Sequence, residues 1–167
     1  MGRLQPQEAS FVETAPFRAM VSMDCQASAA AVFDVLCDHR RWPQWIRSGM
    51  TSVVPTSNPD FGVGSTRTVT LFGVVKVKEQ FVAWEAPTVW AFTCIEFRPK
   101  LFSRLVERFD LESIDEDRCR IVYRIGADLP FWLRPLGNVI AASFGRAAEG
   151  ATARLGDEAV RRQGLTG

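Results

Sequence analysis

Few side chains in this sequence have the chemistry to act as acids or bases inside a protein. Glu79 and Glu96 stand in stretches where each shares a strand face with apolar neighbours, and so does Tyr123. A buried carboxylate needs a partner, or its pKa rises. These groups could exchange a proton with a bound molecule, and Tyr123 could hold a ligand oxygen. The alternative is that both carboxylates lie at strand ends in water.

His39 is the one imidazole in the chain. It stands in the polar run Asp38-His39-Arg40-Arg41, which predicts a solvated helix junction and not a catalytic base inside a pocket. No nucleophile elbow, His-Glu-x-x-His, phosphate loop or Gly-x-Gly-x-x-Gly pattern occurs. We therefore assign no catalytic residue, and the sequence argues against a hydrolase, an NTPase and a dehydrogenase.

Metal and nucleic-acid chemistry are also disfavoured. Cys25, Cys37, Cys94 and Cys119 form no Cys-x-x-Cys pair and are followed by no pair of histidines, so we expect buried free thiols and neither a metal nor a cofactor. Twenty Lys and Arg residues against nineteen Asp and Glu give a net charge of +1. A protein that grips a phosphate backbone usually carries a strong basic excess, so we expect no nucleic-acid partner.

The sequence predicts a cytoplasmic protein without a membrane span. Residues 1–20 lack the apolar core of a signal peptide, and Pro6 breaks the myristoylation pattern. No apolar run reaches the length of about 18 residues that a membrane helix needs. Free thiols also suit a reducing compartment.

Hydrophobic periodicity predicts one α+β domain at residues 17–162, with a flexible tail at 1–16 and another at 163–167. Ser28 is a plausible N-cap for a helix reaching Cys37, and Pro43 suits the first turn of a second short helix. Strands are expected at residues 17–24, 50–54, 66–71, 74–84, 88–97, 105–113 and 118–127. From Pro130 apolar residues recur every three or four positions to about Arg162, which predicts a long helix.

These elements predict a curved antiparallel sheet of six or seven strands wrapped around the long C-terminal helix, with two short helices after the first strand. An antiparallel sheet must bury one face. The terminal helix is the one predicted element long enough to cover it.

Three stretches resemble motifs of the START-like (SRPBCC) superfamily, which includes the polyketide cyclase/dehydrase and lipid-transport family. They are residues 30–45 (AAVFDVLCDHRRWPQW), 62–70 (GVGSTRTVT) and 79–92 (EQFVAWEAPTVWAF). The resemblance implies a helix-grip fold with an internal cavity that holds an apolar ligand. It does not choose among carriers, aromatases, cyclases and receptors, because one fold hosts many functions.

Large side chains on the sheet face small ones on the terminal helix. Ala147, Ala148 and Ala151 share the inner face of that helix with Gly137, and this pattern fits either close packing or room for a ligand. The candidate ligand-binding side chains are Phe81, Trp90, Phe92, Phe109, Leu111, Tyr123, Ile140, Phe144 and Ala148.

Three predicted connections can meet at one end of the sheet and form a cavity mouth. They carry the apolar residues Phe72, Leu101, Phe102, Phe131 and Trp132. Basic residues stand beside them at Arg98, Lys100, Arg104 and Arg134. Apolar tips ringed by basic groups suit a cavity entrance, a transient membrane-surface contact or a homodimer patch. The alternative is that they fold back onto the core.

The function we expect is binding of a hydrophobic small molecule, such as a lipid, a quinone or a polyketide-like compound, by a carrier or sensor. One alternative is a polyketide cyclase or aromatase-type enzyme using the same cavity. The other is a protein-interaction module without a ligand. Polar groups converging inside the cavity would favour the enzyme, and a filled core would favour the interaction module.

Overall fold

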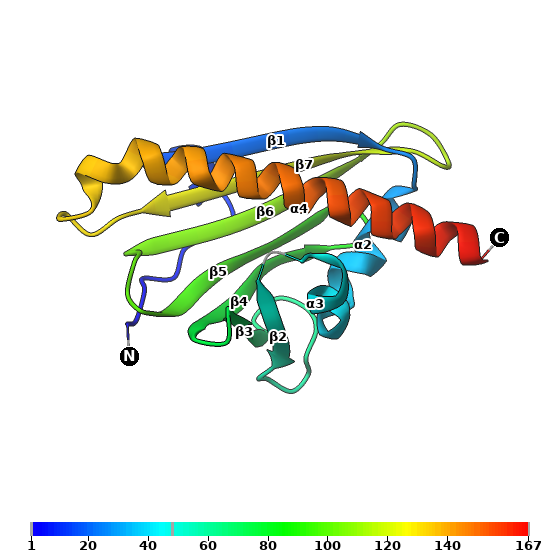
Figure 1. Ribbon diagram of the computed structural model, residues 1–167. Helices are drawn as coiled ribbons and strands as arrows, with labels where there is room; N and C mark the ends of the chain where they lie inside the picture. The colour runs from blue at the N-terminus through cyan, green and yellow to red at the C-terminus, as the bar shows by residue number, and fades with distance from the viewer. Residues whose placement is uncertain (1, 48, 167) are drawn as a thin grey trace.

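The computed structural model describes residues 2–47 and 49–166 (Figure 1). Its elements, in chain order, are α1 (Phe11–Thr14), β1 (Phe17–Cys25), α2 (Ala29–Cys37), η1 (His39–Arg41), α3 (Trp42–Trp45), β2 (Met50–Pro55), β3 (Thr66–Leu71), β4 (Val75–Glu85), β5 (Val89–Arg98), β6 (Arg104–Ser113), β7 (Cys119–Asp128), η2 (Arg134–Leu136) and α4 (Gly137–Thr166). No helix in this part of the chain is long and apolar enough to cross a bilayer.

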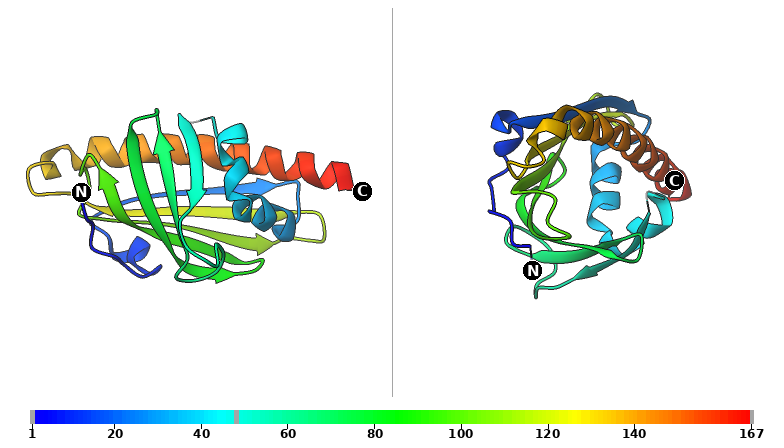
Figure 2. Two further views of the ribbon diagram at one scale, coloured as in Figure 1. Left: turned by 90° about the horizontal axis from the view of Figure 1, so that it is seen from below. Right: turned by 60° about the vertical axis from the view of Figure 1, so that its left-hand side comes forward.

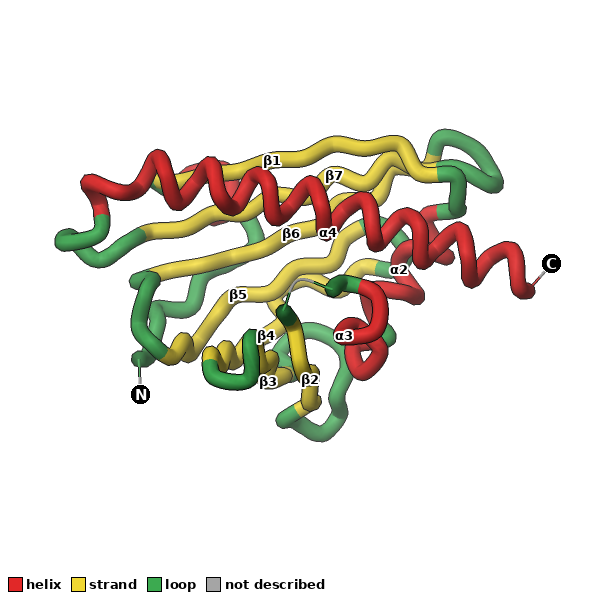
Figure 3. Tube along the Cα trace, viewed as in Figure 1, coloured by secondary structure: helices red, strands yellow, loops and turns green. Residues whose placement is uncertain are grey.

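The seven strands form one antiparallel sheet in the order β1-β7-β6-β5-β4-β3-β2. The sheet curves strongly, and α4 lies along its concave side (Figure 2). This confirms the predicted fold class. The 30-residue helix α4 packs mainly against β1 and α2, and Figure 3 shows α2 and α3 together near one end of the sheet.

Local sequence signals mark the starts of α2 and α3 where they were expected. The Ser28 hydroxyl accepts a hydrogen bond from the Ala31 amide at 3.2 Å, as an N-cap does, and Pro43 stands in the first turn of α3. Gly137 begins α4 against the Phe17 ring, where an added Cβ would come within 1.9 Å of a ring carbon. Close packing therefore explains this glycine.

A shift in register between β4 and β5 decides which side chains of β5 face inward. Glu79 pairs with Cys94, but the preceding Lys78 pairs with Glu96, so Ile95 is left over. Past this bulge Phe97 is buried, and Glu96 is only half-buried. The alternation that placed Glu96 on the same face as Cys94 is broken there.

Residues before β1 pack against the sheet, although the sequence predicted a loose tail. The Leu4 amide donates to the Ile95 carbonyl at 2.9 Å, and the Phe97 amide donates to Gly2 at 3.0 Å. The Gln5 amide donates to the Ser103 carbonyl at 3.1 Å, and Leu4 is buried. Residues 2–5 thus form an N-terminal segment that bridges the ends of β5 and β6, which do not pair with each other.

The core is densest in aromatic rings where β4 and β5 meet η1. Trp90 and Phe81 are almost fully buried, and their ring centroids are 5.0 Å apart. His39 joins them: it is 4% exposed and stacks on Phe81 with centroids 5.0 Å apart. The expectation of a solvated histidine was wrong, because η1 turns the chain back over these rings and carries His39 in with it.

Burial and the nearby guanidinium groups of Arg67 and Arg40 lower the pKa of His39 to about 3. The unfolded chain takes up this proton near pH 6.5, whereas the folded chain resists it. His39 therefore contributes stability that is complete above pH 6.5 and is lost as the pH falls toward 3.

A His39→Phe variant keeps an aromatic ring at this position and removes the titrating group. Its free energy of unfolding, relative to the wild type, should rise by about 2 kcal/mol between pH 8 and pH 5. Urea denaturation at pH 8, 6.5 and 5 measures this difference, with pH 8 as the reference where the imidazole is neutral in both states. A difference that does not change with pH would contradict the buried neutral imidazole.

Candidate functional site

A cavity of about 440 Å³ lies between the concave face of the sheet, α3 and α4. Its wall is mostly apolar. It comprises Trp42, Trp45, Ile46, Met50, Val69, Leu71, Phe72, Val77, Glu79, Phe92, Cys94, Phe97, Leu101, Phe102, Leu105, Glu107, Phe109, Tyr123, Ile125, Phe144, Ala147, Ala148, Ala151 and Leu155. The volume falls in the range of about 300–1,000 Å³ that is typical of small-molecule sites.

The mouth of the cavity is marked by the wall residues that also reach solvent. Phe72, in the turn between β3 and β4, is 70% exposed, and Leu101, between β5 and β6, is 39% exposed. Ala147 of α4 is exposed as well. Phe102 closes the space beneath them, since its ring packs between Phe97 and Phe144 with centroid distances of 5.0 and 5.5 Å.

Four polar side chains interrupt the apolar wall, one from each of four neighbouring strands. They are Glu79 on β4, Cys94 on β5, Glu107 on β6 and Tyr123 on β7. The Tyr123 hydroxyl donates a hydrogen bond to Glu107 Oε2, and the Tyr123 ring stacks on Phe109 with centroids 4.0 Å apart. A proton-bearing pair therefore faces the cavity.

Glu79 is held from behind the wall by Arg67 of β3. The Arg67 Nε donates to Glu79 Oε2 at 2.5 Å, and the arginine side chain is fully buried. Its guanidinium lies over the rings of Trp42, Trp90, Phe92 and Phe81, at 4.2 to 5.3 Å from their centroids. Within the described part of the chain, the two terminal nitrogens of Arg67 have no hydrogen-bond partner. The ring faces supply attraction where hydrogen bonds are missing.

Burial is the main influence on the pKa values of the four polar side chains in the wall. It raises the pKa of Glu107 to about 7, and the neighbouring charge of Glu79 adds to the rise, while the hydrogen bond from Tyr123 opposes it. Burial also raises the pKa of Glu79, and Arg67 opposes that rise. The pKa of Tyr123 and that of Cys94 lie well above their usual values, chiefly through burial. Near pH 7, Glu107 is therefore the group that exchanges a proton.

Sequence reasoning found part of this wall. Five of the candidate ligand-binding residues line the cavity, namely Phe92, Phe109, Tyr123, Phe144 and Ala148. The other four, Phe81, Trp90, Leu111 and Ile140, do not. Phe81 and Trp90 belong to the aromatic core behind Arg67, and Ile140 packs on the core near the start of α4.

Only some of the residues predicted for the mouth line the cavity. Phe72, Leu101 and Phe102 line the cavity, whereas Phe131 and Trp132 do not. These two lie in the connection from β7 to α4 and are 82% and 57% exposed. That connection extends beyond the end of the sheet (Figure 1), so its aromatic side chains lie outside the wall.

Two important residues were missed by sequence reasoning, Glu107 and Arg67. Glu107 alternates with Leu105, Phe109 and Leu111, and Arg67 alternates with Val69 and Leu71. That spacing places both charged groups on the inward face of their strands. Strict application of the two-residue period was the signal that could have found them.

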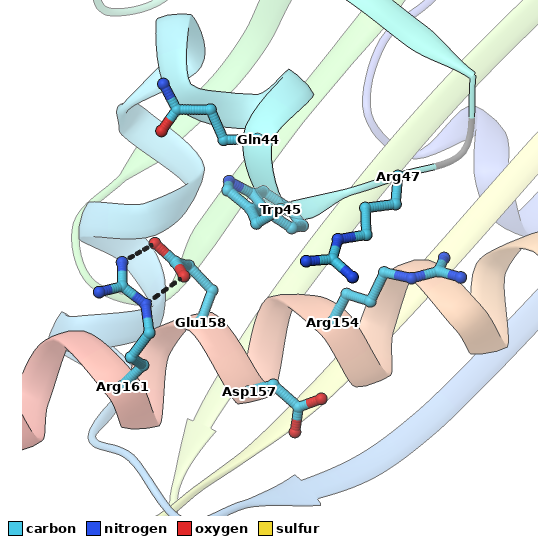
Figure 4. Close-up of a pocket in the computed structure, with 7 residues that line it drawn as sticks. All are labelled: Gln44, Trp45, Arg47, Arg154, Asp157, Glu158 and Arg161. Atoms are coloured by element: carbon cyan, nitrogen blue, oxygen red, sulfur yellow. Dashed lines mark hydrogen bonds and ion pairs between the residues drawn. The ribbon is translucent and has the colours of Figure 1, made fainter.

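A second hollow, an open groove of about 570 Å³, runs between α3 and α4 on the other side of Trp45 (Figure 4). Its residues are mostly charged: Gln44, Trp45, Arg47, Arg154, Asp157, Glu158 and Arg161. Arg161 donates two hydrogen bonds to Glu158, at 2.7 and 2.8 Å. Trp45 lines both hollows and so separates the apolar cavity from this polar groove. The groove is open and lined mostly by charged residues, whereas the cavity is more enclosed and mostly apolar, so we place the candidate site in the cavity. Among the described residues, no cluster of three or more His, Cys, Asp or Glu side chains could hold a metal ion.

Comparison with known proteins identifies the family. The family model described as polyketide cyclase/dehydrase and lipid transport matches residues 16–160, and the chain therefore belongs to this family. Uncharacterised proteins of Mycobacterium tuberculosis and Mycobacterium bovis are each 31% identical to it over 142 residues, covering 81% of this chain and 84% of theirs.

Solved structures show the same fold. A START superfamily protein from Mycobacterium smegmatis superimposes with a TM-score of 0.72 at 12% identity, covering 87% of this chain and 98% of that one. An aromatase/cyclase from Streptomyces sp. R1128 gives a TM-score of 0.73 at 13% identity, covering 87% and 94%. Family and fold together make the protein a START-like domain of the hydrophobic-ligand-binding type.

The buried ion pair behind the wall can be tested by removing its halves singly and together. Arg67→Met leaves Glu79 buried without a partner and should lower the free energy of unfolding by about 3–5 kcal/mol. The double variant Arg67→Met/Glu79→Leu should recover most of that loss, because apolar side chains of similar size tolerate burial. Urea denaturation at pH 7 measures both values.

The exposed pair between Arg120 and Asp24 is the matched control. Arg120→Met should change stability little, because water screens exposed ion pairs. If the double variant proved as unstable as Arg67→Met alone, the damage would come from lost packing around Arg67 and not from an unpaired carboxylate.

Proposed function

We propose that this protein binds a hydrophobic small molecule in the cavity beneath α4 and acts as its carrier or sensor. The observation that carries the proposal is the cavity itself, about 440 Å³ with a mostly apolar wall. Protein interiors are normally close-packed, and voids larger than a water molecule are few. A space of this size inside a small domain is therefore better explained by a ligand than by imperfect packing.

Several features favour an apolar ligand of moderate size, such as a lipid, a quinone or a polyketide-like compound. Phe92 and Phe109 of the sheet and Phe144 of α4 contribute aromatic rings to the wall. The wall contains only four polar side chains. The exposed Phe72 and Leu101 at the mouth give an apolar molecule a surface to meet before it enters. A filled core would have favoured an interaction module without a ligand, and the core has a large void.

The exposed Phe131 and Trp132 lie away from the wall, with Arg134 near them. A transient membrane contact or a homodimer at this connection would cover them, and both remain predictions. Neither is needed for the cavity to bind a ligand.

Filling the cavity from α4 should abolish ligand binding. Ala148 is 2% exposed and lines the cavity, so Ala148→Trp places an indole in the space a ligand would use. We expect the affinity for N-phenyl-1-naphthylamine, a neutral apolar fluorophore, to fall at least about 10-fold while circular dichroism still shows a folded chain. Fluorescence titration measures the affinity, and native mass spectrometry of freshly purified protein can identify a co-purified ligand.

Ala142→Trp is the matched control, because Ala142 is exposed on the same helix and does not line the cavity. That variant should bind the fluorophore as the wild type does. Equal binding by the Ala148→Trp variant would place the binding site elsewhere and contradict the proposal.

A second candidate function, a cyclase or aromatase-type enzyme, is favoured by one specific observation. Tyr123 and Glu107 form a hydrogen-bonded pair in the wall, and the pKa of Glu107 is about 7, where a general acid or base works well at neutral pH. The aromatase/cyclase among the structural neighbours fits this reading.

An enzyme of this kind should depend on the Glu107 carboxyl for turnover. Glu107→Gln should then lower turnover of an aromatic or polyketide substrate by about 100-fold or more while N-phenyl-1-naphthylamine still binds. His39→Gln is the comparison, because His39 is buried outside the wall and should leave turnover within a few-fold. Turnover unaffected by Glu107→Gln would rule out this residue as the acid or base.

A further inference from the structure

The polar part of the cavity wall offers hydrogen-bond acceptors and hardly any free donor. Glu107 accepts one hydrogen bond, at Oε2 from Tyr123, and Glu79 accepts one, at Oε2 from Arg67. Among the described residues neither carboxylate has a partner at its other oxygen. The Tyr123 hydroxyl already donates its proton to Glu107, and the Cys94 thiol is only a weak donor.

The indole groups of the wall do not change this balance near Glu107. The Trp42 Nε1 donates to the Leu36 carbonyl at 3.1 Å. Trp45 keeps a buried indole nitrogen without a partner, but it belongs to α3 and not to the strands that carry Glu107 and Tyr123. A ligand that reaches the sheet therefore meets, when Glu107 is ionised, carboxylate oxygens that accept hydrogen bonds and donate none.

The charges around Glu107 also leave its carboxyl without a positive partner from the protein. Arg67 neutralises Glu79, so Glu107 is the carboxyl of the wall that has no basic partner. The groups that face it are Glu79 and Cys94 on the sheet, Arg67 behind them, and Tyr123 beside it. The helix opposite contributes no charge, since its part of the wall is Phe144, Ala147, Ala148, Ala151 and Leu155.

We propose that the cavity selects an apolar ligand that carries a hydrogen-bond donor, a protonated amine above all and a hydroxyl next, which binds the free oxygen of Glu107, and that it rejects ligands ending in a carboxylate or a phosphate. The inference rests on the proposed function and names the chemical class of its ligand. An ammonium group gives Glu107 the positive partner that the protein does not supply. An anion would bring a further negative charge into a space that already holds two carboxyl groups.

Four naphthalene probes that differ in one substituent test this selection: 2-naphthylmethylamine, 2-naphthalenemethanol, 2-ethylnaphthalene and 2-naphthoic acid. Their affinities are measured at pH 8 by displacement of N-phenyl-1-naphthylamine. The amine should bind at least about 10-fold more tightly than the hydrocarbon, because hydrogen bonds to ionised groups are the stronger kind. The alcohol should fall between them, and the carboxylate should bind at least about 10-fold more weakly than the hydrocarbon.

Proton uptake by Glu107 should change the preference. Lowering the pH from 8 to 6 protonates this carboxyl, whose pKa is about 7, and leaves the amine protonated. The affinity for the amine should fall by up to about 10-fold, while that of the hydrocarbon should not change.

Two variants separate the charge of Glu107 from its packing. Glu107→Gln should bring the affinity for the amine close to that for the hydrocarbon and remove most of the pH dependence. The ratio of the two affinities is compared within each variant, so that a change in packing that affects both probes cancels. Tyr123→Phe keeps the carboxylate and removes only its neutral donor, so the amine should keep its advantage.

Equal affinities for all four probes, or tightest binding of the carboxylate, would overturn the selection while leaving the cavity as a hydrophobic binding site. Failure of the hydrocarbon as well as the other three to bind would contradict the proposed function itself, and this inference with it.

Discussion

The buried ion pair between Arg67 and Glu79 is the interaction on which the arrangement of this protein depends. A guanidinium with no water around it is costly unless an opposite charge and polarisable groups surround it. Here the carboxylate comes from the next strand, and four aromatic rings from α3, β4 and β5 supply the rest. The pair therefore ties the short helix after α2 to the far half of the sheet and fixes the back wall of the cavity.

The same ion pair decides which group in the cavity is free to titrate. Because Arg67 is engaged with Glu79, its charge does little to keep Glu107 ionised. Burial therefore raises the pKa of the Glu107 carboxyl to about 7. His39 lies on the other side of the aromatic core, and Arg67 helps to keep it unprotonated. The two groups act in opposite directions: acid destabilises the fold through His39, and base destabilises it through Glu107. Between their ordinary pKa values the two effects largely offset each other.

The sequence predicted most of the fold but only a minority of the residues in the cavity wall. Periodicity located every strand of the sheet and the long helix, because each element buries one continuous face. It missed the inward turn of His39, since a run of four polar residues predicts solvent wherever tertiary packing does not decide. It left open whether Glu96 faces inward or lies in water, because one extra residue in β5 reverses the alternation and nothing in the local sequence marks that bulge.

From the sequence, the residues of the cavity wall were the hardest to distinguish from those of the packed core. Trp90 and Phe92 are both inward and aromatic, yet Phe92 faces the cavity and Trp90 packs behind it. Which of two buried rings borders a void depends on the three-dimensional position of α4 and α3, which single-strand patterns do not contain. Charged residues at inward positions, such as Arg67 and Glu107, were the better indicators of the site, because each needs a special environment to be buried at all.

The divergence of β5 and β6 exposes the middle of the sheet to misassociation, and residues 2–5 cover it. Where β5 and β6 diverge, their inner edges are capped by residues 2–5 through the amides and carbonyls of Ile95, Phe97 and Ser103. If residues 2–5 detach, two strand edges in the middle of the sheet lose their hydrogen-bond partners, close to Phe97 and Phe102 of the cavity wall. Unpaired strand edges recruit strands from other molecules. The first few residues therefore protect against aggregation from within the sheet, a task that proteins usually assign to their outermost strands.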